Sequence, residues 1–132
     1  MIINSQKRSF GNGSKVSLFT LGTMRAAESS IKMYEIIKYA YYAGINHLET
    51  APSYGNAEIY IGEALRKLTK FEKIQKKYWV ITSKFLPKGN IGELKENFLN
   101  SLNNLKVKKI NNLAIHGLNL FEHLEWVIEG EG

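Results

Sequence analysis

Short β-prone runs alternate along this chain with longer segments of helical periodicity, and this alternation restricts the fold more than any other feature. The β-prone runs fall at residues 16–21, 45–49, 78–83 and 112–115. Their ends lie roughly 30 residues apart, which is the size of a βαβ unit. A chain built this way is expected to form a parallel sheet covered by helices, an α/β fold.

Apolar residues spaced three to four apart predict a helix after each β-prone run. Gly44 stands where a C-terminal cap belongs and ends the first of these helices. The expected helices cover residues 29–43, 57–68, 94–105 and 121–128. Pro87, Gly89 and Gly92 are expected in the loop before the third helix, and the segment before Val16 is expected to form a short hairpin.

Two parallel architectures compete for this pattern. A doubly wound nucleotide-binding sheet should carry G-x-G-x-x-G after its first strand, but residues 21–24 read LGTM. The other architecture is a TIM-type (β/α)8 barrel, whose active sites lie at the C-terminal ends of the strands. Residues 1–132 hold four βα units, so the sequence predicts one domain that forms the first half of such a barrel.

Composition places the chain among globular proteins. Hydrophobic residues make up 44% and charged residues 23%, which argues against disorder. The sequence has no cysteine, so disulfides, thiolate zinc sites and iron–sulfur ligation are excluded within it, and no metal is expected. No apolar run is long enough for a membrane span, and the N-terminus lacks the apolar core of a secretory signal. We therefore expect a cytoplasmic protein.

The net charge of +6 comes from 18 basic and 12 acidic side chains. A basic chain can bind nucleic acid, which requires clustered positive charge. Here the lysines are scattered along the sequence apart from Lys106, Lys108 and Lys109. We interpret the lysines as a solvated surface and expect neither nucleic acid nor a membrane as a partner.

Four side chains of chemical interest follow the ends of different predicted strands. Glu49 and Tyr54 follow the second strand, Lys84 the third and His116 the fourth. Each alone has an ordinary structural explanation, as does His47, which we interpret as a core histidine. In a barrel, however, strand ends converge on one mouth, so these four residues are expected to share a small volume.

This set of groups suits the reduction of a carbonyl. Hydride addition leaves an alkoxide that needs a proton, and a free phenol, with a pKa of about 10, gives one up poorly at neutral pH. A neighbouring ammonium favours the phenolate and eases the transfer. We therefore predict Tyr54 as the acid, Lys84 as the group that activates it, Glu49 as the carboxylate that holds Lys84, and His116 as the residue that orients the carbonyl.

Several segments together resemble the aldo-keto reductase family over essentially the whole chain. Residues 43–55, AGINHLETAPSYG, are similar to the family signature G-[IV]-N-x-[FL]-D-T-A-x-x-Y-G. Glu58 and Gly62 follow at the start of the next helix as in the family. Further similar segments are LGTM at residues 21–24, VITSK at 80–84, and Ser101-Leu102 through LAIH at 113–116.

The resemblance implies a TIM-type barrel that reduces aldehydes or ketones with NADPH or NADH. It places the family's catalytic tetrad on Glu49, Tyr54, Lys84 and His116, with the tyrosine as general acid. It also implies that Gly22, Thr23 and Glu49 contact the nicotinamide end of the cofactor, whereas later strands and loops grip the phosphates. The expected partner is a small carbonyl substrate.

Two positions depart from the family pattern. Glu49 replaces an aspartate, which lengthens the side chain by one methylene, and Asn111 replaces another, which we interpret as structural. The glutamate leaves open a second hypothesis, a non-catalytic binding or regulatory protein on the same scaffold.

The length of the chain suggests a third hypothesis, a half-barrel that pairs with a second copy through exposed strand edges. We expect these 132 residues to be a truncated fragment, inactive alone and poorly stable as a monomer. Part of this instability is expected to come from an apolar inner face over residues 78–83 that lacks its opposite strands.

Overall fold

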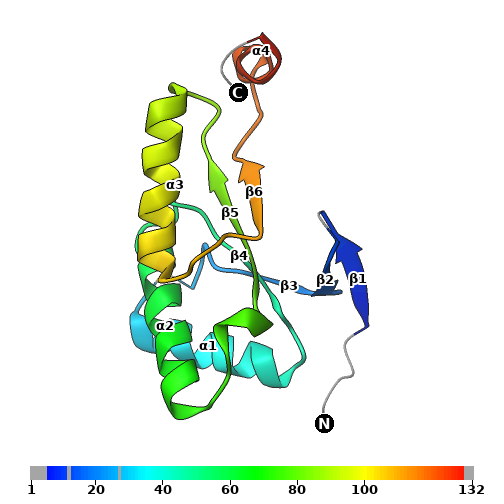
Figure 1. The fold of residues 1–132 in the computed structure, drawn as a ribbon, viewed down its shortest axis with the longest axis vertical. Helices are drawn as coiled ribbons and strands as arrows, with labels where there is room; N and C mark the ends of the chain where they lie inside the picture. The colour runs from blue at the N-terminus through cyan, green and yellow to red at the C-terminus, as the bar shows by residue number, and fades with distance from the viewer. Residues whose placement is uncertain (1–5, 12, 27, 130–132) are drawn as a thin grey trace.

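The computed structural model describes residues 6–11, 13–26 and 28–129. Its centre is a four-stranded sheet in the order β3-β4-β5-β6, in which all neighbouring strands are parallel (Figure 1). The strands are β3 (Thr20–Gly22), β4 (His47–Glu49), β5 (Val80–Phe85) and β6 (Asn112–Ile115). The predicted α/β fold and the predicted sequential strand order are therefore confirmed.

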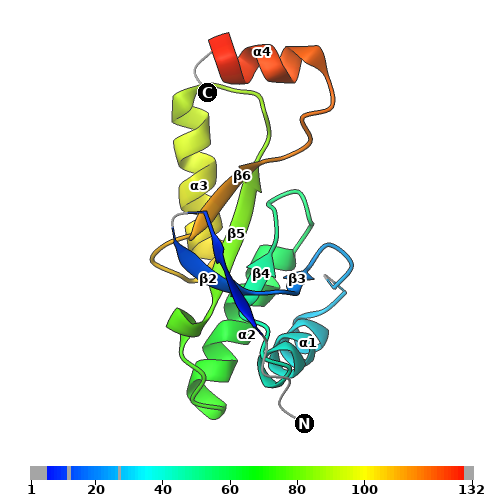
Figure 2. The same cartoon turned by 90° about the vertical axis from the view of Figure 1, so that its right-hand side faces the viewer.

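Helices follow each strand as expected. They are α1 (Ser30–Tyr42), α2 (Ala57–Phe71), α3 (Ile91–Leu105) and α4 (Phe121–Glu129), with a short 3-10 helix, η1 (Lys76–Tyr78), before β5. Helices α1, α2 and α3 cover one face of the sheet, whereas α4 lies beyond the end at which β5 and β6 finish (Figures 1 and 2). The Trp126 indole N–H of α4 donates to the Gly89 carbonyl at 3.1 Å.

One loop prediction was wrong. Gly92 lies in the first turn of α3, and not in the preceding loop, because Asn90 caps that helix. The Asn90 side-chain oxygen accepts hydrogen bonds from the Gly92 and Glu93 N–H groups at 2.9 and 3.1 Å, while the Glu93 carboxylate accepts from the Asn90 N–H. This reciprocal capping box satisfies donors that a helix start otherwise leaves free. None of the described helices is long and apolar enough to cross a membrane.

The chain begins with the predicted hairpin, β1 (Lys7–Phe10) paired antiparallel with β2 (Ser14–Ser17). Val16 and Ser17 belong to this hairpin, so the predicted first strand over residues 16–21 was partly wrong. Asn46 explains the difference: its side-chain oxygen accepts from the Ser17 N–H at 2.7 Å, and its own N–H donates to the Ser17 hydroxyl at 3.1 Å. These bonds fasten the hairpin across the end of the sheet at which β4 begins.

Two other strands start later than predicted. Strand β4 starts at His47 and not at Ile45, because the Ile45 N–H donates to the Ala40 carbonyl and Asn46 is engaged with the hairpin. Strand β5 starts at Val80, because Tyr78 closes η1. Local side-chain and turn bonds at these positions replace ladder bonds, and a hydrophobicity pattern does not register such bonds.

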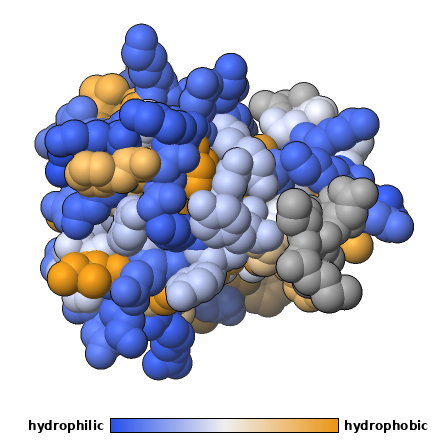
Figure 3. All heavy atoms as spheres, turned by 90° about the horizontal axis from the view of Figure 1, so that it is seen from below, coloured by the Kyte–Doolittle hydropathy of each residue, from blue (hydrophilic) through white to orange (hydrophobic). Residues whose placement is uncertain are grey.

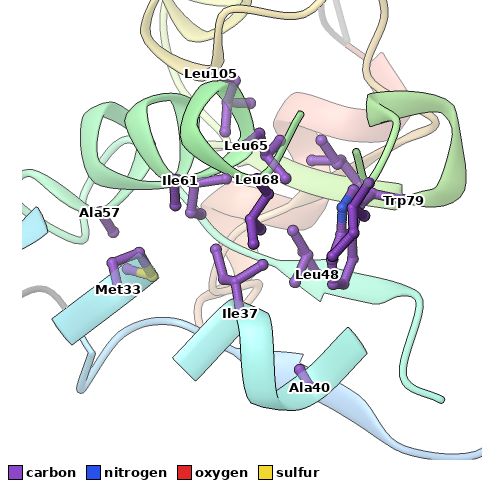
Figure 4. Close-up of a cluster of buried hydrophobic side chains, with 13 residues drawn as sticks. Met33, Ile37, Ala40, Leu48, Ala57, Ile61, Leu65, Leu68, Trp79 and Leu105 are labelled. Carbon is purple, nitrogen blue, oxygen red and sulfur yellow. The ribbon is translucent and has the colours of Figure 1, made fainter. Parts of the chain in front are cut away.

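The hydrophobic core lies between the sheet and the helices (Figure 4). Met33 and Ile37 of α1 face Ile61 and Leu65 of α2, and these side chains are at most 1% exposed. Leu48 of β4 lies under them and is fully buried. Each fully buried aliphatic side chain contributes about 1.5–3 kcal/mol of transfer free energy, so this cluster is the main source of stability.

The other face of the sheet is polar where an apolar face was expected. His47 is 4% exposed and shares hydrogen bonds of 2.8 Å with the hydroxyls of Thr20 and Thr82. Phe10 of the hairpin packs on the His47 ring at a centroid distance of 4.9 Å. The expectation of an apolar inner face over residues 78–83 was partly wrong: Val80 lies on this side and is apolar, but Thr82 brings a hydroxyl that bonds to His47. His47 is the core histidine predicted.

Gly62 of α2 lies where this helix approaches the backbone at the end of α3 closely. A Cβ atom there would lie 2.2 Å from the Asn104 carbonyl oxygen and 2.9 Å from the Leu105 carbonyl carbon. Because backbone atoms cannot yield as a side chain does, Gly62→Ala should lower the free energy of unfolding by about 1–3 kcal/mol. Urea unfolding measures this, with Arg66→Ala at an exposed position of the same helix as the control. Equal midpoints for Gly62→Ala and the unaltered chain would contradict the close packing.

Burial lowers the pKa of His47 below its ordinary 6.5 in the folded state. The unfolded chain therefore binds this proton at a higher pH than the folded chain does. The contribution of the neutral His47 ring to the free energy of unfolding should be fully present above about pH 6.5. It should be lost as the pH drops below that value, by up to about 1.4 kcal/mol per pH unit. When the free energy of unfolding is measured between neutral and mildly acidic pH, its slope against pH should be shallower for His47→Gln than for the unaltered chain. His123→Gln is the control and should keep the slope of the unaltered chain.

Candidate active site

The four residues predicted to carry chemistry meet at one edge of the sheet. Glu49 is the last residue of β4, Lys84 is the last but one of β5, and His116 follows β6 directly. Tyr54 lies in the loop between β4 and α2. Because the strands are parallel and in register, their C-terminal ends fall together, as the sequence predicted.

Lys84 is the centre of this group. Its ammonium forms an ion pair with the Glu49 carboxylate, donates to the Tyr54 hydroxyl at 2.8 Å and donates to the Thr50 carbonyl at 3.2 Å. An ammonium has three protons, so these three acceptors fix its position. The Lys84 side chain is only 13% exposed, and this burial lowers the pKa of Lys84 below its ordinary value.

Tyr54 and His116 complete the group. Their rings meet edge to face, with centroids 5.5 Å apart at an angle of 88°. The Lys84 ammonium also lies 4.4 Å from the centroid of the Tyr54 ring, where the ring's negative face attracts a cation. The phenol, the ammonium and the imidazole are thus neighbours, as a proton donor, its activating group and a second hydrogen-bonding group need to be.

Ser53 also belongs to the site, although the sequence analysis did not identify it. Its hydroxyl shares a hydrogen bond of 3.1 Å with Nδ1 of His116. A partner on one ring nitrogen fixes the orientation of the imidazole and the role left to the other nitrogen. The only signal in the sequence is the position of Ser53 directly before Tyr54, and the 63 residues that separate it from His116 concealed the contact.

Gly22 and Thr23 lie beside Glu49 at the same edge. Gly22 pairs with Glu49 in the sheet and is exposed, with no side chain to cover the edge. Thr23 is fully buried, and both its N–H and its hydroxyl donate to the Glu49 carbonyl, at 3.1 and 3.0 Å. Thr23 therefore fixes the end of β4, while the surface at this edge comes from Gly22 and Glu49.

A pocket of about 650 Å³ opens next to Lys84 and His116. Its volume lies within the range of small-molecule sites. Its wall combines apolar side chains, Phe85 and Leu86 among them, with charged ones on the loop after β5 and on α3. Lys84 and His116 of the four-residue group, together with Ser53, therefore border a space into which a small molecule fits.

Other signature residues have structural roles. The buried Glu58 carboxylate accepts a hydrogen bond of 2.7 Å from the Ser83 hydroxyl, which ties α2 to the strand that carries Lys84. The Asn111 side-chain oxygen accepts from the Ile81 N–H at 3.0 Å, and the Asn111 N–H donates to the Ile81 carbonyl at 2.9 Å. An aspartate at position 111 could accept the same bond, so the structural interpretation of this departure agrees with the contacts.

Comparison with known families gives one match. A model described as the aldo/keto reductase family covers residues 18–123, which include every member of the four-residue group. The chain belongs to the aldo-keto reductase family. This membership agrees with the resemblance found in the sequence.

Two solved structures assigned to the aldo-keto reductases of Pseudomonas aeruginosa are similar to this chain. The first has a TM-score of 0.79 at 25% identity, over 98% of this chain and 52% of the other. The second has a TM-score of 0.77 at 25% identity, over 98% and 53%. This chain thus spans about half the length of the aldo-keto reductases it matches.

Proposed function

We propose that this chain carries the catalytic residues of a nicotinamide-dependent reductase of aldehydes and ketones. The observation that supports this most strongly is the position of the Lys84 ammonium, held by Glu49 and Thr50 and directed at the Tyr54 hydroxyl. A carbonyl that receives hydride needs a proton donor whose conjugate base is stabilised. Tyr54 with Lys84 beside it meets this requirement.

In the proposed mechanism the substrate occupies the pocket that Lys84 and His116 line, with its carbonyl oxygen directed at the Tyr54 hydroxyl beside Lys84. Tyr54 donates its phenolic proton to the oxygen of the substrate. The ammonium of Lys84 stabilises the phenolate that remains, and Glu49 keeps that ammonium in place. His116, oriented through Ser53, directs a hydrogen bond to the same oxygen before the proton moves.

NADPH or NADH is the proposed cofactor, and its chemistry is to supply the hydride. The residues present fit the reacting end of such a molecule. Gly22 leaves the edge of the sheet uncovered, and the carboxylate of Glu49 lies beside it: a Cβ atom on Gly22 would be 3.6 Å from Glu49 Oε2. Gly22 and Glu49 would hold the nicotinamide ring at this edge, with Thr23 fixing the backbone beneath them.

The proposed architecture is the first half of a TIM-type (β/α)8 barrel, formed by residues 1–132 as one domain behind an N-terminal hairpin. The sequential parallel order and the match to about half of the chain in two solved aldo-keto reductase structures support it. We propose the cytoplasm as its location. A non-catalytic protein on the same scaffold is the alternative, and its only support is the glutamate at position 49.

Tyr54→Phe tests the proton donor. It removes the hydroxyl and keeps the ring, so turnover of a simple aldehyde with NADPH should fall by about 10²–10⁴-fold. The assay follows nicotinamide oxidation in the natural protein at its full length. Tyr39→Phe, at a position 75% exposed on α1, is the matched control and should leave turnover unchanged. Equal turnover by Tyr54→Phe and the unaltered protein would eliminate Tyr54 as the acid.

Glu49→Asp tests the carboxylate. The charge that holds Lys84 remains and the side chain takes the family's length, so turnover should stay equal or rise, whereas Glu49→Gln should lower it. The same nicotinamide assay measures both variants. An unaltered protein that binds NADPH but turns over no simple aldehyde, and gains no activity from Glu49→Asp, would favour the non-catalytic alternative.

The unpaired edges of the sheet lead to an expectation about the oligomeric state of the 132-residue chain. Among the described strands, β3 and β6 each have a neighbour on one side only, and such edges pair readily with other chains. We propose that the 132-residue chain self-associates, and that sedimentation should detect species larger than a monomer. Leu113→Lys puts a charge on β6 and should shift the chain toward the monomer, whereas Leu99→Lys on α3 should not. A monodisperse unaltered monomer would contradict this proposal.

A further inference from the structure

Lysines that are scattered in the sequence gather in space at the end of the sheet where β4, β5 and β6 begin. They come from the hairpin, from η1 and from the loop between α3 and β6, which lie near one another in Figure 2. Together they line an open pocket of about 790 Å³. The lysines are Lys7, Lys15, Lys76, Lys77, Lys106, Lys108 and Lys109.

Positive charge in this lysine pocket is not balanced. No residue that lines it is an aspartate or a glutamate, and within the described part of the chain no ion pair involves one of its seven lysines. Burial and the charges of Lys106 and Arg66 lower the pKa of Lys76. The end of the molecule shown in Figure 3 is mostly hydrophilic, with few apolar patches. An anion that bound here would relieve this repulsion.

We propose that the lysine pocket binds a small polyanion that carries several phosphate groups. A pocket of this volume suits a small molecule, since such sites commonly measure about 300–1,000 Å³. Lysine ammonium groups act as point charges that bind phosphate oxygens from several directions. Because the lysines come from three separate segments, the hairpin, η1 and the loop between α3 and β6, they line the pocket from more than one side.

The aromatic residues of the pocket argue against single-stranded nucleic acid. Binding of that kind uses exposed aromatic rings on which bases stack. Trp79 is 3% exposed. Tyr78 packs edge-on against Tyr41 and Trp79, and the Lys7 ammonium lies 5.6 Å from its ring centroid. Trp79 is too buried for a base to stack on it, and the Lys7 ammonium lies over the ring of the partly buried Tyr78, so the pocket is better suited to phosphate groups than to bases.

The lysine pocket is separate from the candidate active site. It lies at the N-terminal ends of the strands, whereas Glu49, Lys84 and His116 lie at the C-terminal ends. The two sites have no residue in common among those that line their pockets. The proposal therefore does not depend on the reductase activity.

Calorimetric titration of the full chain with inorganic tripolyphosphate at fixed ionic strength tests the proposal. The double variant Lys108→Gln/Lys109→Gln should bind at least about tenfold more weakly, a change of about 1.4 kcal/mol. Both lysines are exposed, so the variant should fold normally. The matched control, Lys32→Gln/Lys67→Gln on α1 and α2, removes the same net charge and should change affinity by less than about twofold. Tyr54→Phe should leave the affinity unchanged.

Three results would overturn the proposal. Absence of measurable binding by the unaltered chain would show that the lysines form only a solvated surface. Equal weakening in the two double variants would show a response to net charge and not to the pocket. Tighter binding of an RNA oligonucleotide than of tripolyphosphate, with the same dependence on Lys108 and Lys109, would identify the face as a nucleic-acid surface.

Discussion

The three contacts of the Lys84 ammonium depend on nearly every other feature of this structure. Glu49 and Thr50 come from the end of β4, and Tyr54 comes from the loop behind it, so the contacts exist only if β4 and β5 keep their parallel register. A shift by one residue would turn Lys84 to the helical face of the sheet. The core between β4, α1 and α2 and the bond from Ser83 to Glu58 keep the register fixed.

The strand register places the ammonium of Lys84 in a largely buried position, and this burial has a free-energy cost. Removing an ammonium from water is unfavourable, which is why burial lowers the pKa of Lys84. The carboxylate of Glu49 offsets part of this cost, and its extra methylene does not prevent contact with Lys84. The ion pair with Lys84 that the resemblance implies for an aspartate is therefore also made by a glutamate, which weakens the support that Glu49 gives to the non-catalytic alternative.

Periodicity was sufficient to predict the order of the strands, the helices between them and the convergence of Glu49, Tyr54, Lys84 and His116. Periodicity did not predict the element boundaries correctly where polar side chains form hydrogen bonds with backbone groups in place of other backbone groups. Asn46 bonds to Ser17 of the hairpin, so β4 begins only after it at His47. Asn90 caps α3, so Gly92 lies within that helix. Contacts between residues far apart in the sequence, such as Ser53 with His116 and the lysines of the lysine pocket, leave no local pattern and appear only in three dimensions.

The sheet face opposite the helices carries both the buried His47 and the Lys84 group. His47 and Glu49 alternate to the same side of β4, as Thr82 and Lys84 do on β5, so the buried imidazole lies on the same face as the ammonium. A protonated His47 would place a second positive charge on this face. Its hydrogen bonds to Thr20 and Thr82 can be satisfied by the neutral ring, one nitrogen donating and the other accepting. The hairpin, which packs on His47 through Phe10, contributes to the burial that lowers the pKa of His47 and so favours the neutral ring on this face.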